Sequence, residues 1–154
     1  LRAAGCTRTA RRRLLTAQPA VSTAHRYERP GKSRAYAVRN PRRSQNEARL
    51  LARVWPGRAG ETVLDAPCGA GRLTPFLRDR GHVVLQVDGA FAMLREARDA
   101  AVAGALAVQA DVLQLPFADR SVDGVVLFRF LHHLPPDAAR TALAEACRVA
   151  RRFV

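Results

Sequence analysis

The chain has 154 residues, with 26 Lys or Arg against 13 Asp or Glu, so its formal net charge is +13. This length suits one domain with a sizeable core, and no apolar run is long enough to span a membrane. Its three cysteines are far apart and form no CxxC pair, which excludes a disulfide framework and a cysteine-based zinc site and favours reduced thiols in a cytoplasmic protein.

The positive charge lies in the N-terminal third of the chain. Residues 1–60 hold 15 Lys or Arg and two acidic residues, whereas residues 61–154 hold 11 of each kind. Residues 1–25 contain no acid and are predicted to be a basic, disordered leader, with organellar targeting as an alternative. Nucleic acid is expected to bind only through this leader, if at all. Because the chain begins at Leu1, we interpret it as a fragment or a processed product.

Residues 26–58 are predicted to form a helical cover for the domain that follows. Ser44 and Glu47 have the spacing of a capping box, and an apolar periodicity follows them until Pro56. The sequence therefore predicts a helix that begins at Ser44, and a separate α/β domain over residues 59–154.

The stretch 61–77 is predicted to be a buried strand, a turn of small residues and a helix. The strand ends at Asp65, and the turn contains Gly69 and Gly71. Such a turn presents unpaired backbone N–H groups and the positive end of a helix dipole to a ligand. Thr74 stands where a dinucleotide site needs a third small residue, and no Lys-Ser or Lys-Thr pair completes a Walker A motif. The carboxylate of Asp65 would repel a pyrophosphate, but it suits a ligand with a cationic group.

This turn resembles the first motif of the class I S-adenosylmethionine-dependent methyltransferases, acid-x-Gly-x-Gly-x-Gly. Asp65-Ala-Pro-Cys-Gly69-Ala-Gly71 matches the motif except at Pro67, which stands where the first glycine is usual. The resemblance implies that Asp65, Ala66, Gly69 and Gly71 contact S-adenosylmethionine.

A second predicted strand, over residues 82–87, leads to Asp88 and Gly89. An acid at this place in a Rossmann-type sheet accepts hydrogen bonds from ribose hydroxyls, and Asp88 follows Asp65 by 23 residues, close to the required spacing. Gly89 is included in the predicted cofactor site. Met93 lies in a near match to the family's acid-x-Ser-x-x-Met-Leu stretch, which implies contact with adenine; a core methionine is an equally good interpretation.

The resemblance is closest over residues 110–134. The matching segments are Ala110-Asp111, Leu115-Pro116-Phe117, Ser121-Val-Asp123 and Leu131-His132-His133-Leu134, in the order typical of small-molecule methyltransferases of this class. The match implies that Asp111 accepts from the adenine amino group, that the Val112 N–H donates to a ring nitrogen, and that Phe128 faces the methionine moiety. In the family, aromatic and arginine side chains before the cover helix reach that moiety, which points to Tyr36 and Arg39.

No metal site and no catalytic residue are predicted. His132 and His133 are adjacent, so on a helix their side chains point about 100° apart and cannot share one ion. One of them is a candidate general base. A sulfonium donor is already activated, so the protein mainly aligns the donor with the acceptor and excludes water.

Alternating strand and helix patterns predict an α/β fold with a Rossmann-like, doubly wound and mostly parallel sheet. Predicted strands end near residues 65, 88, 110 and 128, with helices over 72–79, 91–102 and 137–150. The last of these helices is expected to bury a stripe of Ala139, Leu143, Ala146 and Val149. The resembled family has seven strands, so we expect the chain to be truncated after the fourth strand. Arg151 to Val154 would then be only the approach to a fifth strand, and the fragment would be a poor enzyme.

The predicted function is S-adenosylmethionine-dependent methylation of a small-molecule acceptor. One alternative keeps the fold but makes the protein an NAD-type oxidoreductase, against which Thr74 and Asp65 both argue. The other is a nucleic-acid-binding module that depends on the basic N-terminal third.

Overall fold

The computed structural model describes residues 41–100 and 105–154. The predictions for the leader, Tyr36, Arg39 and the end of the helix at Val102 lie outside these residues. The helices are α2 (Pro41–Val54), α3 (Thr74–Arg78), α4 (Phe91–Ala100), the 3-10 helix η2 (Leu131–His133) and α5 (Pro136–Val149). The strands are β1 (Thr62–Asp65), β2 (Val83–Asp88), β3 (Leu106–Gln109), β4 (Val122–Val126) and β5 (Ala150–Phe153).

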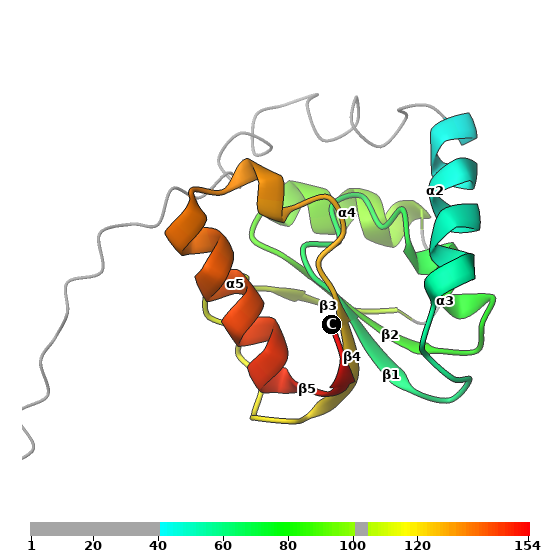
Figure 1. Ribbon diagram of the computed structural model, residues 1–154. Helices are drawn as coiled ribbons and strands as arrows, with labels where there is room; N and C mark the ends of the chain where they lie inside the picture. The colour runs from blue at the N-terminus through cyan, green and yellow to red at the C-terminus, as the bar shows by residue number, and fades with distance from the viewer. Residues whose placement is uncertain (1–40, 101–104) are drawn as a thin grey trace, which may run out of the picture.

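The five strands form one sheet in the order β3-β2-β1-β4-β5, and every pair of neighbours is parallel (Figure 1). From β1 the chain adds β2 and β3 on one side, and then crosses to add β4 and β5 on the other. The strand order therefore switches between β1 and β4, and ligands of open α/β sheets bind at the carboxyl ends of strands beside such a switch. The predicted doubly wound, Rossmann-like fold is confirmed.

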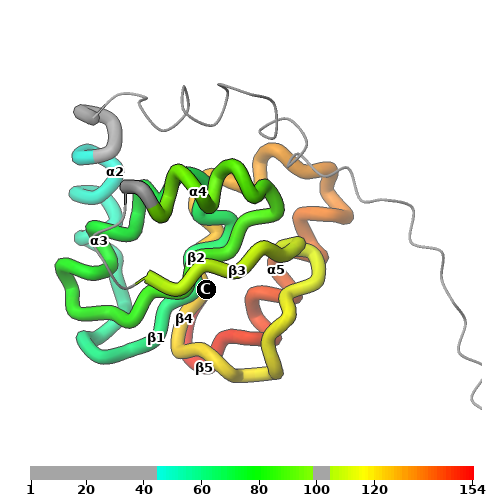
Figure 2. Tube along the Cα trace, turned by 180° about the vertical axis from the view of Figure 1, so that it is seen from behind, coloured from blue at the N-terminus to red at the C-terminus, as the bar shows by residue number. Residues whose placement is uncertain are grey.

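Helices cover both faces of the sheet. In Figures 1 and 2, α5 lies on one face, while α2 and α3 lie on the other. Because side chains alternate along a strand, Leu64 packs into the α5 cluster and Val63 into the α3 cluster. Val125 and Val126 divide in the same way on β4. Burial on both faces explains why these strands are continuous apolar runs.

The prediction that the chain stops before a fifth strand is wrong. β5 pairs with β4, with Val122 opposite Ala150 and Gly124 opposite Phe153. Gly124 is required here because a side chain at this position would overlap the Phe153 ring. That ring also meets Trp55 at the end of α2, edge to face, with 5.5 Å between centroids. The fourth strand is therefore not an exposed edge.

Trp55 is the main contact between the end of α2 and the sheet. Its Nε1–H donates to Nε2 of His82 over 2.9 Å, and its ring meets Phe76 edge to face with 5.4 Å between centroids. The pKa of His82 is lowered, first by burial and then by the nearby charge of Arg80. A neutral imidazole nitrogen can accept a hydrogen bond from the indole N–H, whereas an imidazolium cannot.

Several predicted boundaries need correction. Helix α2 begins at Pro41, so Ser44 lies inside the helix and is not its cap. Proline fits the first turn of a helix, where its missing N–H has no partner to lose. Helix α3 begins at Thr74 rather than at residue 72, and β4 ends at Val126 rather than at Phe128. On α5 the buried stripe contains Ala142 in place of the expected Leu143, which is 44% exposed. None of the described helices is long and apolar enough to cross a membrane.

Candidate functional site

The side chains predicted to form the site converge on the carboxyl edge of the sheet. Asp65 and Asp88 are the last residues of β1 and β2, and Asp111 and Phe128 each follow the next strands by two residues. The edge is also tied together by its backbone. The N–H of Ala66 donates to Val126 over 3.0 Å, and that of Ala110 donates to Asp88 over 3.1 Å. The four strand ends therefore lie side by side along one edge of the sheet, which includes the switch between β1 and β4.

The glycine turn is shaped by positive φ angles. Gly69 and Gly71 have φ of 54° and 73°, a region that other residues enter at a cost. At Gly71 a side chain would also meet Nε2 of Gln86 at 3.0 Å and Cβ of Ala97 at 3.1 Å. Thr74, which argued against a dinucleotide site, is buried and accepts from Gln86 over 2.6 Å. The turn thus packs directly on β2 and α4.

The prediction that this turn presents unpaired backbone N–H groups is only partly correct, because several of these groups have partners within the protein. The N–H of Gly71 donates to Cys68 and that of Thr74 donates to Gly71, over 3.0 and 3.1 Å. The N–H of Gly69 donates to Oδ2 of Asp88 over 2.9 Å. Helix α3 has five residues and begins beyond the turn, so it does not present the long helix N-terminus that the sequence suggested. The ligand-binding potential of this region therefore rests mainly on its carboxylates.

Asp65 is the unusual group of the site. Its side chain is 2% exposed, and its Oδ2 is buried without a hydrogen-bond partner. The pKa of Asp65 is raised to about 8, mainly by burial and also by the charge of Asp88, while Arg72 acts in the opposite direction. Burying a carboxyl group without a partner is costly, and a cationic ligand group would remove that cost.

Asp88 is buried and already orders the backbone around it. Its two carboxylate oxygens accept from the N–H groups of Gly69 and Ala90, both over 2.9 Å. A carboxylate offers about four acceptor positions, so these bonds are compatible with further bonds from a ligand's hydroxyl groups. Gly89 is held beside it, because its carbonyl accepts from Nε2 of Gln109 over 3.1 Å.

The segment after β3 forms a tight turn at the edge of the site. Oδ1 of Asp111 accepts from the N–H of Leu113 over 2.9 Å, while Val112 is buried in the α5 cluster. Asp111 itself is exposed. Met93 is 2% exposed, which agrees with the core interpretation of this residue.

A clamp on α5 holds the rest of this segment. Arg148 donates to the carbonyls of Leu115 and Phe117, over 3.0 and 2.8 Å, and Glu145 accepts from the N–H of Leu115 over 2.8 Å. Arg148 also pairs with Glu145 and with Asp119, each at 2.8 Å. These bonds explain why the loop between β3 and β4 runs alongside α5 in Figure 2. The clamp begins only three residues after Val112, so we describe Arg148 as a positioning residue of this loop.

The sequence analysis missed an ionic cluster between α2 and the site. Glu47 of α2 pairs with Arg129, which follows β4, over 2.7 Å, and with Arg72 of the glycine turn over 3.4 Å. Arg129 has a positive φ of 55°. We had interpreted Glu47 as half of a capping box. Only the position of Arg72 directly after Gly71 could have suggested a role at the site.

The two adjacent histidines lie in η2, beyond β4. We expected their side chains to point apart, but the rings of His132 and His133 contact each other, with centroids 3.9 Å apart. Both residues are exposed. Within the described part of the chain, no group of three His, Cys, Asp or Glu residues is arranged to hold a metal ion.

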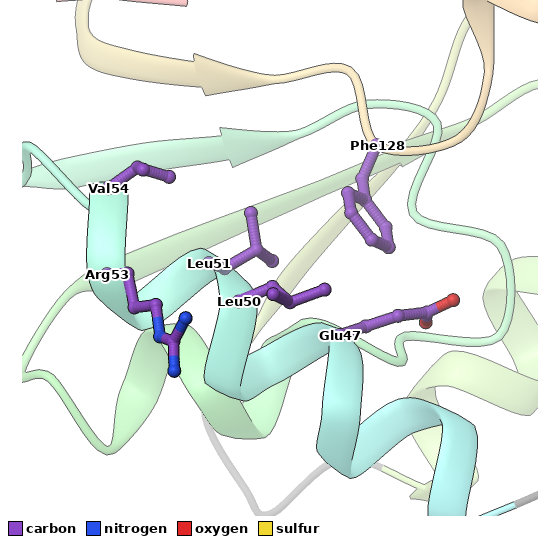
Figure 3. Close-up of a pocket in the computed structure, with 6 residues that line it drawn as sticks. All are labelled: Glu47, Leu50, Leu51, Arg53, Val54 and Phe128. Atoms are coloured by element: carbon purple, nitrogen blue, oxygen red, sulfur yellow. The ribbon is translucent and has the colours of Figure 1, made fainter.

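An apolar groove of about 380 Å³ opens between α2 and Phe128 (Figure 3). Leu50, Leu51 and Val54 line it along α2, and Glu47 lies at one end. In Figure 3 the ring of Phe128 faces Leu50 and Leu51, while Arg53 points away from it.

The parallel sheet, with its strand order and the helices on both faces, defines an α/β protein of the Rossmann-like class. More specifically, residues 64–152 match the methyltransferase domain family, and the chain belongs to that family.

Two curated relatives and one solved structure indicate how far the likeness extends. The chain is 37% identical over 89 residues to a malonyl-[acyl-carrier protein] O-methyltransferase of Hamiltonella defensa, covering 58% of this chain and 33% of that protein. It is 37% identical over 97 residues to a demethylmenaquinone methyltransferase of Thermobifida fusca, covering 60% and 40%. A SAM-dependent methyltransferase from Aquifex aeolicus has the same fold, with a TM-score of 0.64 at 23% identity and coverage of 80% and 68%. The chain therefore spans less than half the length of these two curated relatives.

Proposed function

We propose that this chain binds S-adenosylmethionine at the carboxyl edge of its sheet and forms the donor half of an enzyme that methylates a small-molecule acceptor. The observation that carries the proposal is Asp65, a buried carboxyl group with one oxygen unpartnered at the strand switch. S-adenosylmethionine carries a sulfonium and an ammonium group, so it supplies positive charge that can pair with this carboxylate. An NAD pyrophosphate would bring negative charge to the same place.

The remaining residues have roles that fit the other parts of this ligand. Asp88 lies one strand away, where it can accept from the ribose hydroxyls in addition to ordering Gly69 and Ala90. Asp111 and the backbone of Val112 flank the position expected for adenine. Family membership supports these assignments together with Ala66, Gly71, Gly89, Met93 and Phe128, whose positions at the strand ends or beneath them are compatible with contact.

The chemistry expected of the chain is alignment rather than acid or base catalysis. S-adenosylmethionine supplies an activated methyl group, and the acceptor's heteroatom or carbon displaces the sulfide in a single step. The task of the protein is to hold donor and acceptor in line and to exclude water. Asp65, the glycine turn and Asp88 hold the donor. His132 or His133 would serve as a base for an acceptor that must lose a proton.

The nature of the acceptor is suggested only broadly. The two relatives above are named for malonyl-[acyl-carrier protein] and for demethylmenaquinone, and these names are compatible with a small molecule or a small group on a carrier as the acceptor. Whether this chain acts alone depends on the parts of those longer proteins that it does not match. We therefore propose the donor site for the chain and the complete activity for the protein to which this domain belongs.

Titration calorimetry separates this proposal from its competitors. The protein is titrated with S-adenosylmethionine, S-adenosylhomocysteine, NAD and a mixed pool of RNA and DNA. We expect saturable one-to-one binding of the two adenosyl ligands and none of NAD. Tight NAD binding without adenosyl binding would replace the proposal with an oxidoreductase, and salt-sensitive binding of nucleic acid alone would favour a basic binding module.

A further inference from the structure

The groove between α2 and Phe128 keeps apolar side chains at the surface. Leu50 is 62% exposed and Val54 is 74% exposed. Both lie on α2, a helix that otherwise carries many polar residues. Leu51, on the same wall, is half-buried against the α3 cluster. Exposed apolar residues are common singly, but a concave group of them facing an aromatic ring is the usual lining of a ligand site. The volume of about 380 Å³ lies at the lower end of the range for small-molecule pockets.

One end of the groove is polar and rigidly tied. There the carboxylate of Glu47 pairs with Arg129 over 2.7 Å and with Arg72 over 3.4 Å. The side chain of Glu47 is only 15% exposed, so this cluster is a fixed feature rather than a mobile surface pair. A ligand in the groove would therefore meet an apolar wall along α2 and hydrogen-bonding groups at the end nearest the glycine turn.

This polar end adjoins the proposed donor site. Phe128 follows β4 by two residues, and the last residue of β4 is hydrogen-bonded to Ala66 directly after Asp65. Arg72, which pairs with Glu47, is close enough to Asp65 to affect its titration. Phe128 is thus common to the groove and to the edge where the methyl donor is expected.

We infer that this groove is the acceptor subsite, and that it takes a methyl acceptor with an apolar body and its polar, reacting group at the Glu47 and Arg129 end. The inference rests on the proposed function, because it uses the donor site to decide what lies beside it. A wholly polar acceptor, such as a free amino acid or a sugar, would leave Leu50 and Val54 facing it without benefit. A second copy of the chain is the competing occupant, and self-association is measured for that reason.

The test uses 2-naphthol as the probe, because it joins an apolar bicyclic body to a nucleophilic hydroxyl. Its binding to the full chain is measured by calorimetry with S-adenosylhomocysteine present. The variant is Leu50→Gln combined with Val54→Gln, two exposed positions whose change leaves the core intact. Leu143→Gln is the matched control, since it is also an exposed leucine on a helix but lies on the opposite face of the sheet. The affinity for S-adenosylhomocysteine and the sedimentation of each protein are measured in parallel.

We expect 2-naphthol to bind the parent chain and the Leu143→Gln control equally, and to bind the double variant about tenfold more weakly, because two apolar walls have become amides. S-adenosylhomocysteine should bind all three proteins alike. The inference is overturned if 2-naphthol does not bind the parent chain, if the double variant binds it as well as the control does, or if the parent chain is a dimer that the double variant dissociates. If S-adenosylhomocysteine binds none of the proteins, the proposed function fails and the inference fails with it. If it binds and 2-naphthol does not, only the inference fails.

Discussion

The carboxyl edge of the sheet and the α5 clamp differ in how their ionisable side chains are paired. At the clamp, Arg148 is matched by two carboxylates and two carbonyls, and Glu145 also accepts a backbone N–H. At the edge, Asp65 is more deeply buried than either residue, yet one of its oxygens has no partner. Buried polar groups are nearly always paired within a protein, and this exception stands at the strand end where we propose that the methyl donor binds. The difference separates charged groups that hold a loop in place from a buried carboxyl group that we propose pairs with a cationic ligand.

The largest effect is expected at Asp88, because this residue both orders the backbone around it and is proposed to contact the ligand. In Asp88→Asn, the amide group cannot accept from both Gly69 and Ala90, and it loses the charge that a ribose hydroxyl would meet. Bonds to charged groups are worth about 1.5–3 kcal/mol, so the affinity for S-adenosylhomocysteine should fall about 10- to 150-fold. Calorimetry measures this change, with Asp137→Asn, an exposed acid, as the control. Unchanged affinity in a folded Asp88→Asn protein would remove Asp88 from the site.

Asp65→Asn should separate stability from binding. The pKa of Asp65 is about 8 in the folded chain against 3.8 for the free group, so between these values the folded chain keeps a proton that the unfolded chain releases. Raising the pH over this range therefore favours unfolding, and a neutral amide removes the effect. The variant should match the parent near pH 4 and be more stable by about 1–3 kcal/mol at pH 8, while losing affinity for S-adenosylmethionine.

Chemical denaturation at several pH values tests the first half of this prediction, and calorimetry tests the second. A variant that is less stable than the parent at pH 8 would show that the Asp65 carboxylate has a stabilising partner. A variant that binds S-adenosylmethionine normally would show that the unpartnered oxygen does not meet the ligand.

A comparison of two glycines in different turns separates the effect of backbone strain from that of close packing. Gly60 and Gly71 have φ of 86° and 73°, but a side chain at Gly60 would touch nothing within 4 Å, whereas one at Gly71 would press on Gln86 and Ala97. Each alanine variant should lose about 1–2 kcal/mol of stability from strain. Gly71→Ala should lose more than this and should also weaken cofactor binding. Equal losses in denaturation experiments would mean that the turn adapts to a side chain.

The clamp should show the smallest effect on the ligand. Arg148→Met removes bonds to Leu115 and Phe117, so the loop that carries Asp111 should loosen. About a third of the Arg148 side chain is exposed, and solvent screens part of its charge. We expect a lower melting temperature than in Arg140→Met, a more exposed ion pair on the same helix, together with weaker binding of adenosine. If both variants melt alike and bind adenosine alike, Arg148 does not position the loop.

Much of this edge could be predicted because the signals are local. The acids at the ends of β1 and β2 and the glycines between them are close in sequence, and the apolar run before each acid indicates the strand that carries it. The loop after β3 was placed by its resemblance to the family. By contrast, the partnership of Glu47 with Arg72 and Arg129 joins residues as many as 82 positions apart, and no local pattern predicts it.

The errors have similar causes. The spacing of Ser44 from Glu47 predicts a helix cap, but the helix begins three residues earlier, at Pro41. Arg151 to Val154 were expected to be only the approach to a fifth strand, but the strand begins at Ala150, and its two arginines are tolerated because both are exposed. Leu143 was expected to be buried on the basis of its hydrophobicity, although the smaller Ala142 is the residue that fits against the sheet. Side-chain size and tertiary contacts decide these cases.

The proton balance of cofactor binding tests the central claim most directly. At pH 7 a carboxyl group with a pKa of about 8 is mostly protonated, and a cationic ligand beside it would drive that proton off. Calorimetric titrations of S-adenosylmethionine in buffers with different heats of ionisation give the number of protons released. We predict the release of about one proton per ligand in the parent chain, and none in whatever binding Asp65→Asn retains. Binding without proton release, or equal release in both proteins, would contradict the assignment of Asp65 as the group that receives the cationic methyl donor.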